Sequence, residues 1–215
     1  MTQKLLLVVG AGPGISLSTA KKFGREGFQV ALISRRLDAL QQYEEELLHL
    51  GIKAKGFVGD ISAENSLKTA IESVLKTYGK IDVLLYNAAA GKPGKPTNLN
   101  AEDLINDFNI SVVGALTTVK ASLPYIENGA ILMTGGGLAL TPYADFASLS
   151  IGKAGIRSFA NSLHQELSPK GIYVGTLTIK GFVQEGTYFS AENIAHAFYR
   201  MYEEQKEAEI IFEEK

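Results

Sequence analysis

The stretch KLLLVVGAGPGIS, residues 4–16, joins a short apolar run to a glycine-rich turn. Its first part predicts a strand buried on both faces of a sheet, because it is brief and rich in Val and Leu. Gly10, Gly12 and Gly14 would let the backbone turn tightly and approach a phosphate, which the free N–H groups of a helix start bind. Alone the motif is weak, since such turns also join strands to helices where no ligand binds.

After residue 16, short apolar runs alternate with longer amphipathic ones along the rest of the chain. The pattern predicts seven strands: Lys4–Val9, Gln29–Ser34, Lys53–Val58, Ile81–Tyr86, Ala130–Thr134, Tyr173–Thr178 and Glu209–Phe212. Helical spacing predicts helices at residues 37–50, 63–77, 101–125, 148–168 and 191–203. Such alternation indicates parallel strands joined by right-handed crossovers. We therefore expect an α/β fold: one Rossmann-type domain over residues 1–215, with a doubly wound, parallel, seven-stranded sheet and helices on both faces.

The 21 basic and 23 acidic side chains of this 215-residue chain leave a formal charge of −2. That balance argues against a nucleic-acid partner, which needs a broad basic surface. The chain has no cysteine and only three histidines, in separate predicted helices, so we expect no metal site. No apolar run approaches the ~20 residues that span a bilayer, and none is typical of a signal peptide. We expect a cytoplasmic protein with no membrane partner.

The residues after the second strand bear on the choice of cofactor, because ligands of such sheets bind beyond the carboxyl ends of the strands. The strand ends in Ser34, followed by Arg35 and Arg36. A carboxylate here would accept hydrogen bonds from the ribose hydroxyls of NAD, whereas guanidinium groups pair with a phosphate. The sequence therefore favours NADP(H). The alternative is a solvated charge pair at the start of the next helix.

Two further motifs follow the third and fourth predicted strands, as the glycine turn follows the first. Asp60-Ile61 follows the third strand, and Tyr86-Asn87-Ala88-Ala89 ends the fourth. With these motifs in this order, the chain resembles the short-chain dehydrogenase/reductase family along nearly its whole length. It matches two of the three glycines in that family's G-x-x-x-G-x-G spacing, with Ser16 in the third place.

The resemblance implies roles for individual residues. Asn109 and Lys153 match the asparagine and lysine of the family's catalytic tetrad. The implied NADP(H) contacts are Gly10, Gly12, Gly14, Ile15, Ser34, Arg35, Arg36, Asp60, Ile61, Asn87, Ala88, Lys153 and Gly181. The segment 182–190 is much shorter than the lid that covers the substrate in the family, so it would exclude water poorly.

The two remaining tetrad members are replaced. The family's proton donor is a tyrosine four residues before the lysine, and a serine thirteen residues before that tyrosine holds the substrate oxygen. Here Leu149 and Gly136 occupy those positions, and neither has a hydrogen-bonding side chain. Tyr143 and Thr134 are the candidates to replace them.

The flanking serines, Ser148 and Ser150, are weaker candidates. They lie about 100° to either side of Leu149 on the predicted helix. Their hydroxyls are also far poorer acids than a phenol.

Several functions follow from these observations. The first is an NADP(H)-dependent oxidoreductase that transfers a hydride to or from a small carbonyl or alcohol by a non-standard proton path. The second is a catalytically inactive NADP(H)-binding sensor or scaffold, and a third has lost even the nucleotide. Whether the chain is an enzyme stays open at this point, because fold alone does not determine activity.

The resemblance also implies a homodimer or homotetramer, in which helices 101–125 and 148–168 pair with those of a neighbour. Leu116, Val119, Phe159 and Leu163 are candidates for that face. They could equally pack on their own sheet.

Overall fold

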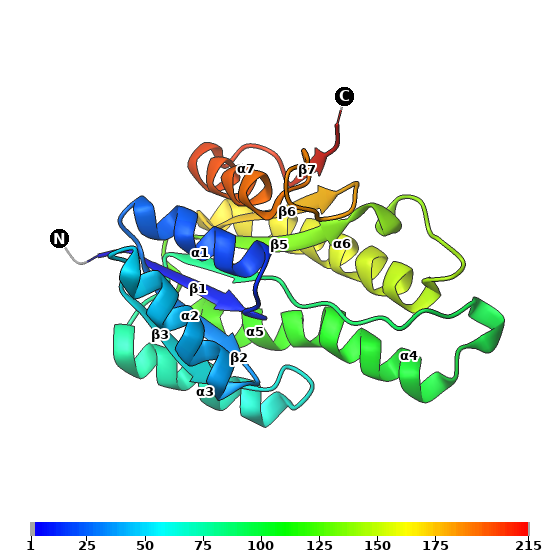
Figure 1. Cartoon of the computed structure of the whole chain (residues 1–215), viewed down its shortest axis with the longest axis horizontal. Coiled ribbons are helices and arrows are strands. Elements are labelled where there is room, and N and C mark those ends of the chain that lie inside the picture. The colour runs from blue at the N-terminus through cyan, green and yellow to red at the C-terminus, as the bar shows by residue number, and fades with distance from the viewer. Residues whose placement is uncertain (1–2, 215) are drawn as a thin grey trace.

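A computed structural model describes residues 3–214 and contains one sheet of seven parallel strands in the order β3-β2-β1-β4-β5-β6-β7 (Figure 1). The strands are β1 (Leu5–Val9), β2 (Gln29–Ser34), β3 (Ala54–Val58), β4 (Val83–Tyr86), β5 (Ala130–Gly136), β6 (Tyr173–Ile179) and β7 (Glu209–Phe212). The seven predicted strands are confirmed, as is the doubly wound parallel architecture. Their predicted ends are shifted by two residues at most.

Helices cover both faces of the sheet (Figure 1). One layer holds α1 (Ile15–Arg25), α2 (Leu37–His49) and α7 (Ala191–Glu204), and the other holds α3 (Glu64–Tyr78), α5 (Gly114–Ser122) and α6 (Ala147–Leu167). Successive residues of β1 point to opposite faces. Leu6 and Val8 pack against the first layer, while Leu7 packs against the second. This two-sided burial explains why β1 is apolar at every position.

The predicted helix 101–125 is interrupted. It comprises α4 (Ala101–Phe108), a π-helical turn at Asn109–Val113, α5, and a 3-10 turn at Leu123–Tyr125. The Tyr86 hydroxyl donates a hydrogen bond to the carbonyl oxygen of Ile110, inside the π turn. A Cβ on the buried Gly114 would lie 2.6 Å from that hydroxyl. The sequence pattern missed the break because it depends on contact with β4 rather than on local propensity.

The four residues predicted to form an oligomer face behave differently from one another. Val119 and Leu163 are buried in the core under the sheet, and Phe159 packs against that core. Leu116 alone of the four is largely exposed, at 43%. Val119 and Leu163 therefore pack on their own sheet, which is one of the two alternatives that the sequence left open.

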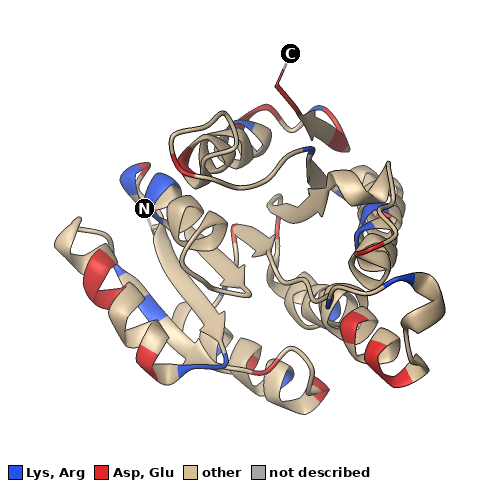
Figure 2. Ribbon diagram, turned by 45° about the vertical axis from the view of Figure 1, so that its right-hand side comes forward, with Lys and Arg blue, Asp and Glu red and all other residues tan. Residues whose placement is uncertain are grey.

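Charged side chains of both signs are interspersed over the helices and loops, and most strands carry none (Figure 2). Within residues 3–214, no helix is both long enough and apolar enough to cross a membrane.

The two-sided burial of β1 gives a stability prediction. Replacing the fully buried Leu7 by Ala removes apolar contacts and leaves a cavity, so we expect a loss of about 2–5 kcal/mol in the free energy of unfolding. The matched variant Leu48→Ala changes a side chain that is 68% exposed, and should cost less than about 0.5 kcal/mol. Urea unfolding measures both. Equal losses would contradict the assigned core.

Candidate cofactor and active site

A cleft of about 290 Å³ opens at the carboxyl ends of β1, β2, β3 and β4. It is lined by Gly10, Ala11, Ser34, Arg35, Gly59, Asp60, Ile61, Asn87, Ala88, Ala89, Ala90 and Ile110. The structure thus brings together seven of the residues expected to contact the cofactor, from segments far apart in the sequence. Gly12, Gly14, Ile15, Arg36, Lys153 and Gly181 are not among the lining residues of this cleft.

The glycine turn has two kinds of glycine. Gly10 adopts a φ of +86°, which side-chain-bearing residues rarely adopt, and a Cβ on it would lie 2.9 Å from the Ala88 nitrogen. A Cβ on Gly12 or Gly14 would meet no atom within 4 Å. Helix α1 begins at Ile15 without a side-chain cap, so its first N–H groups lack intrahelical partners. Open space beside such a helix start fits a phosphate group.

Ser16 is a structural residue of the site that sequence reasoning did not single out for a role. Its buried hydroxyl donates a hydrogen bond to the Gly10 carbonyl oxygen at 2.8 Å and accepts one from the Asn87 amide at 2.7 Å. It therefore ties the start of α1 to the turns after β1 and β4. Its place at the third glycine of the family spacing was the available signal.

The two arginines after β2 lie in different surroundings. Arg35 lines the cleft, whereas Arg36 precedes α2 with its Nε 3.9 Å from Asp38, and its side chain is 70% exposed. The predicted pair therefore has one cleft residue, not two, because consecutive residues at a strand end point in different directions.

Asp60 follows β3 beside the end of β2, where the Gly59 N–H donates to the Ser34 carbonyl oxygen at 3.0 Å. Its carboxylate accepts hydrogen bonds from the hydroxyl of Ser62 at 2.7 Å and from the Ser62 backbone N–H at 2.9 Å. These bonds, with a smaller contribution from the charge of Arg35, hold the pKa of Asp60 below its usual value. The carboxylate is thus ionised and its loop is held in place.

Lys153 marks the other part of the predicted site, at the end of β5. Its half-buried side chain donates a hydrogen bond from Nζ to the Thr134 carbonyl oxygen at 3.0 Å. Burial lowers the pKa of this ammonium from 10.5 to about 8. A Cβ on Gly136 would lie 3.2 Å from Lys153 Cε, so the lysine stem runs directly past the position where the family has its serine.

Leu149, in the place of the family's tyrosine, lies one helical turn before Lys153. A Cβ on Gly91 would be 2.5 Å from Leu149 Cβ, so the segment after β4 closes directly onto this turn of α6. A bridge between Gly94 and Phe146 holds the same segment in place. The positions that carry the family's reacting pair are therefore gathered near Lys153, but with apolar or absent side chains.

Two of the four nearby hydroxyls are engaged with other groups. Ser148 donates to the buried carboxylate of Asp107, and Ser150 donates to the Phe146 carbonyl oxygen at 2.9 Å.

The other two hydroxyls belong to the predicted substitutes. Tyr143 is 55% exposed, and its ring stacks on that of Phe146. The Thr134 hydroxyl is buried and has no hydrogen-bond partner within residues 3–214, while the main-chain oxygen of Thr134 accepts from Lys153.

The remaining predicted site residues lie at the periphery. Asn109 begins the π-helical turn and is half-buried. Gly181 follows β6, where the Phe189 ring packs directly against it and in turn contacts Phe212. The end of the short 182–190 segment is thus anchored to β7, while Phe182 is 92% exposed.

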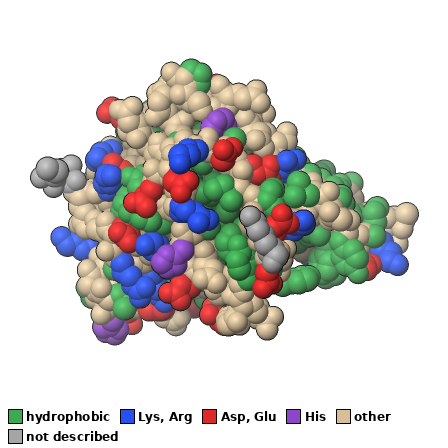
Figure 3. All heavy atoms as spheres, turned by 90° about the horizontal axis from the view of Figure 1, so that it is seen from above, with side chains coloured by type: hydrophobic (Ala, Val, Ile, Leu, Met, Phe, Trp, Pro, Cys, Tyr) green, Lys and Arg blue, Asp and Glu red, His purple; other side chains and the backbone are tan. Residues whose placement is uncertain are grey.

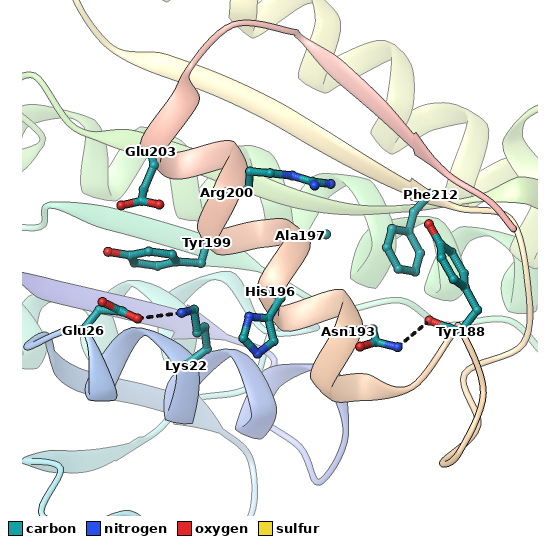
Figure 4. Close-up of a pocket in the computed structure, with 10 residues that line it drawn as sticks. All are labelled: Lys22, Glu26, Tyr188, Asn193, His196, Ala197, Tyr199, Arg200, Glu203 and Phe212. Carbon is teal, nitrogen blue, oxygen red and sulfur yellow. Dashed lines mark hydrogen bonds and ion pairs between the residues drawn. The ribbon is translucent and has the colours of Figure 1, made fainter. Parts of the chain in front are cut away.

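A larger depression, of about 610 Å³, lies between α1 and α7 and contains none of the predicted site residues (Figure 4). Lys22 there pairs with Glu26 at 2.6 Å and lies 4.5 Å over the Tyr199 ring. No glycine is among the residues that line it, so we place the site in the smaller cleft. Among residues 3–214, no cluster of His, Cys, Asp and Glu could hold a metal ion.

Comparison with known proteins identifies the family of the chain. Residues 4–193 match the short chain dehydrogenase family. This chain is a member of that family. An uncharacterized oxidoreductase of Staphylococcus epidermidis is 27% identical to this short-chain dehydrogenase over 208 residues, covering 91% of this chain and 89% of the relative.

Solved structures of short-chain dehydrogenases share the fold. One from Burkholderia cenocepacia, in complex with NADP, has a TM-score of 0.85 at 22% identity and covers 93% of this chain and 90% of its own. A metagenomic short-chain oxidoreductase, also with NADP, has a TM-score of 0.87 at 21% identity, covering 98% and 96%. The family resemblance is thus confirmed, whereas the roles of the individual site residues stay predictions.

The buried ammonium gives a prediction about stability. Between pH 8 and 10.5 the unfolded chain holds the Lys153 proton and the folded chain has released it, so the stability attributable to this group rises with pH. We expect the free energy of unfolding of the wild type to increase relative to that of Lys153→Met across this window. Urea titrations at a series of pH values test this. A difference that does not change with pH would contradict the burial of this ammonium.

Proposed function

We propose that this short-chain dehydrogenase binds NADP(H) and transfers a hydride between the nicotinamide and a small carbonyl compound or alcohol. The observation that carries the proposal is the convergence of Gly10, Ser34, Arg35, Asp60 and Asn87 on one cleft at the strand ends. Such crevices are where sheets of this kind bind dinucleotides. The residues present fit the cofactor, since open space lies over Gly12 and Gly14 at the start of α1.

The preference for a phosphorylated cofactor rests on the end of β2. Ser34 provides no carboxylate for the ribose hydroxyls of NAD, and Arg35 lines the cleft beside it. A guanidinium group pairs with a phosphate both in charge and in the geometry of its donors. The NADP complexes of the two similar structures support the same preference.

The other residues take roles by position. The turn at Gly10–Gly14 and the first turn of α1 would hold the pyrophosphate, and Asp60-Ile61 the adenine. Asn87 and Ala88 would line the nicotinamide side of the cleft. Lys153 and Gly181 would face the nicotinamide side, where the bound cofactor supplies the hydride. Asn109 would support Lys153 from the π turn.

A second candidate function is a catalytically inactive NADP(H)-binding sensor or scaffold. The observation that favours it is that Leu149, in the place of the family's tyrosine, has no acidic group and is packed closely against Gly91. This function predicts affinity for the nucleotide without turnover of any carbonyl compound.

We further propose assembly into a homodimer or homotetramer. Hydrophobic side chains gather over the end of the molecule that carries α4 (Figure 3). Ile105 and Phe108 of α4 are 58% and 36% exposed, and Leu116 of α5 and Ile151 of α6 are each 43% exposed. These residues replace Val119 and Leu163 as candidates for the shared face.

The cofactor proposal is tested by titration with NADPH and NADH. We expect NADPH to bind more tightly, and Arg35→Ala to weaken NADPH by about tenfold or more while leaving NADH little changed, because a charge-assisted contact of about 1.5–3 kcal/mol is lost. Arg36→Ala is the matched control and should retain NADPH affinity, since its side chain is exposed beside Asp38. Binding of neither nucleotide, or a preference for NADH, would refute this assignment.

The missing pair gives a gain-of-function prediction. The double variant Gly136→Ser, Leu149→Tyr should raise the rate of NADPH-dependent carbonyl reduction by about 10²-fold or more, because it adds an acid and a hydroxyl donor beside Lys153. The serine Cβ would approach only the flexible lysine stem, at 3.2–3.4 Å. Initial rates on a panel of small ketones and aldehydes measure the effect. If NADPH still binds to the variant but turnover is absent, the result contradicts this prediction and supports the sensor or scaffold function.

A further inference from the structure

Lys153 is placed so that part of its hydrogen-bonding capacity is free. An ammonium has three N–H donors, and one of them is held by the Thr134 carbonyl oxygen at 3.0 Å. The stem lies against Gly136, which has no side chain to compete for the remaining two donors. The neighbouring Leu149 cannot accept a hydrogen bond from them. Two protons of the ammonium are therefore available to a ligand or to water at the end of β5.

The charged groups on the elements around Lys153 are occupied by other partners. Arg157, one turn further along α6, forms a two-pronged ion pair with Glu209 of β7 at 2.7–2.9 Å. Lys180, after β6, pairs with Glu213 at 2.6 Å.

On the α4 side, the carboxylate of Asp107 accepts the hydroxyl of Ser148. Among residues 3–214, no carboxylate thus pairs with Lys153, and burial lowers its pKa to about 8. A general acid is most effective when its pKa lies near the working pH, and lysines tuned to about 7–8 by burial serve in this way.

We propose that the Lys153 ammonium is itself the proton donor to the carbonyl oxygen of the substrate, in the place of the missing phenol. This inference rests on the proposed NADP(H)-dependent reduction and assigns the proton step within it. Ser148 and Ser150 donate to other acceptors, and Tyr143 stacks on Phe146. The Thr134 hydroxyl has no hydrogen-bond partner among residues 3–214, but an aliphatic hydroxyl is a far poorer acid than an ammonium. Lys153 is therefore the group with both free protons and a suitable acidity.

When bound, the reduced nicotinamide supplies the hydride and is itself oxidised. The carbonyl carbon gains a C–H bond, and the electron pair of the C=O π bond moves to the oxygen. That oxygen takes a proton from Lys153 Nζ, so an N–H bond breaks as an O–H bond forms. The neutral amine then takes a proton from water, and the product is an alcohol.

The first test needs no cofactor. Competitive labelling of the nucleotide-free protein with acetic anhydride over a range of pH, read by mass spectrometry, gives the titration midpoint of the Lys153 amine. We expect a midpoint near 8, with the exposed Lys170 as the reference amine that calibrates the reagent. A Lys153 amine that titrates at its ordinary value of 10.5 would overturn the proposal.

The second test measures NADPH-dependent reduction of 2,3-butanedione. The acid must be protonated, so kcat should fall as the pH rises through the midpoint found by labelling. Lys153→Arg keeps a positive charge that cannot be released, and should lower kcat by about 10²–10⁴-fold. Both Lys153→Arg and Lys153→Met should keep the far-UV circular dichroism spectrum and the cooperative urea unfolding of the wild type, which shows that they fold. Lys170→Arg is the control and should keep the wild-type rate and pH profile.

The outcomes separate this proposal from the one on which it rests. If NADPH binds but the wild type does not reduce butanedione, or if Lys153→Arg keeps the rate or the alkaline decline, the Lys153 role is wrong and the cofactor site stands. If NADPH does not bind to the wild type, both fall together.

Discussion

The contact between the turn after β1 and the turn after β4 is the constraint on which the site depends. Strand β1 lies between β2 and β4, so the chain leaves its two neighbours toward opposite faces and a crevice opens between them. Gly10 must be a glycine there, because its φ is +86° and its Cα packs against Ala88. The Ser16 hydroxyl bridges the same two turns, because it donates to the Gly10 carbonyl oxygen and accepts from the Asn87 amide. The width of the cleft follows from this approach of two backbones.

The two parts of the candidate site differ in the surroundings of their charged side chains. At the ends of β2 and β3, Arg35 and Asp60 line the cleft, and hydrogen bonds from Ser62 favour the ionised form of Asp60. At the end of β5, Lys153 is desolvated and has no carboxylate partner among the described residues, so its charged form is only weakly favoured. A permanent charge suits binding, whereas a proton that is easily released suits transfer. The same chain thus provides a recognition end and a candidate reaction end.

Much of the fold could be predicted because local pattern and global topology agree. Every strand is a short apolar run, and runs buried on both faces are typical of parallel sheets. The interruption of helix 101–125 could not be predicted in this way, because the π turn depends on the Tyr86 hydroxyl reaching Ile110. Val119 and Leu163 were ambiguous for a related reason: an apolar helical stripe does not say whether it faces its own sheet or a neighbouring molecule.

The sequence by itself determined the doubly wound sheet, the glycine turn, the candidate cofactor residues and the replacement of the tyrosine and serine by Leu149 and Gly136, since each is a matter of residue type and spacing. The tertiary structure alone decided that Arg35 enters the cleft and Arg36 does not, that Ser148 and Ser150 are engaged elsewhere, and that Lys153 lies desolvated against Gly136. Direction, hydrogen-bond partner and burial arise where segments distant in sequence meet, and no local pattern encodes them.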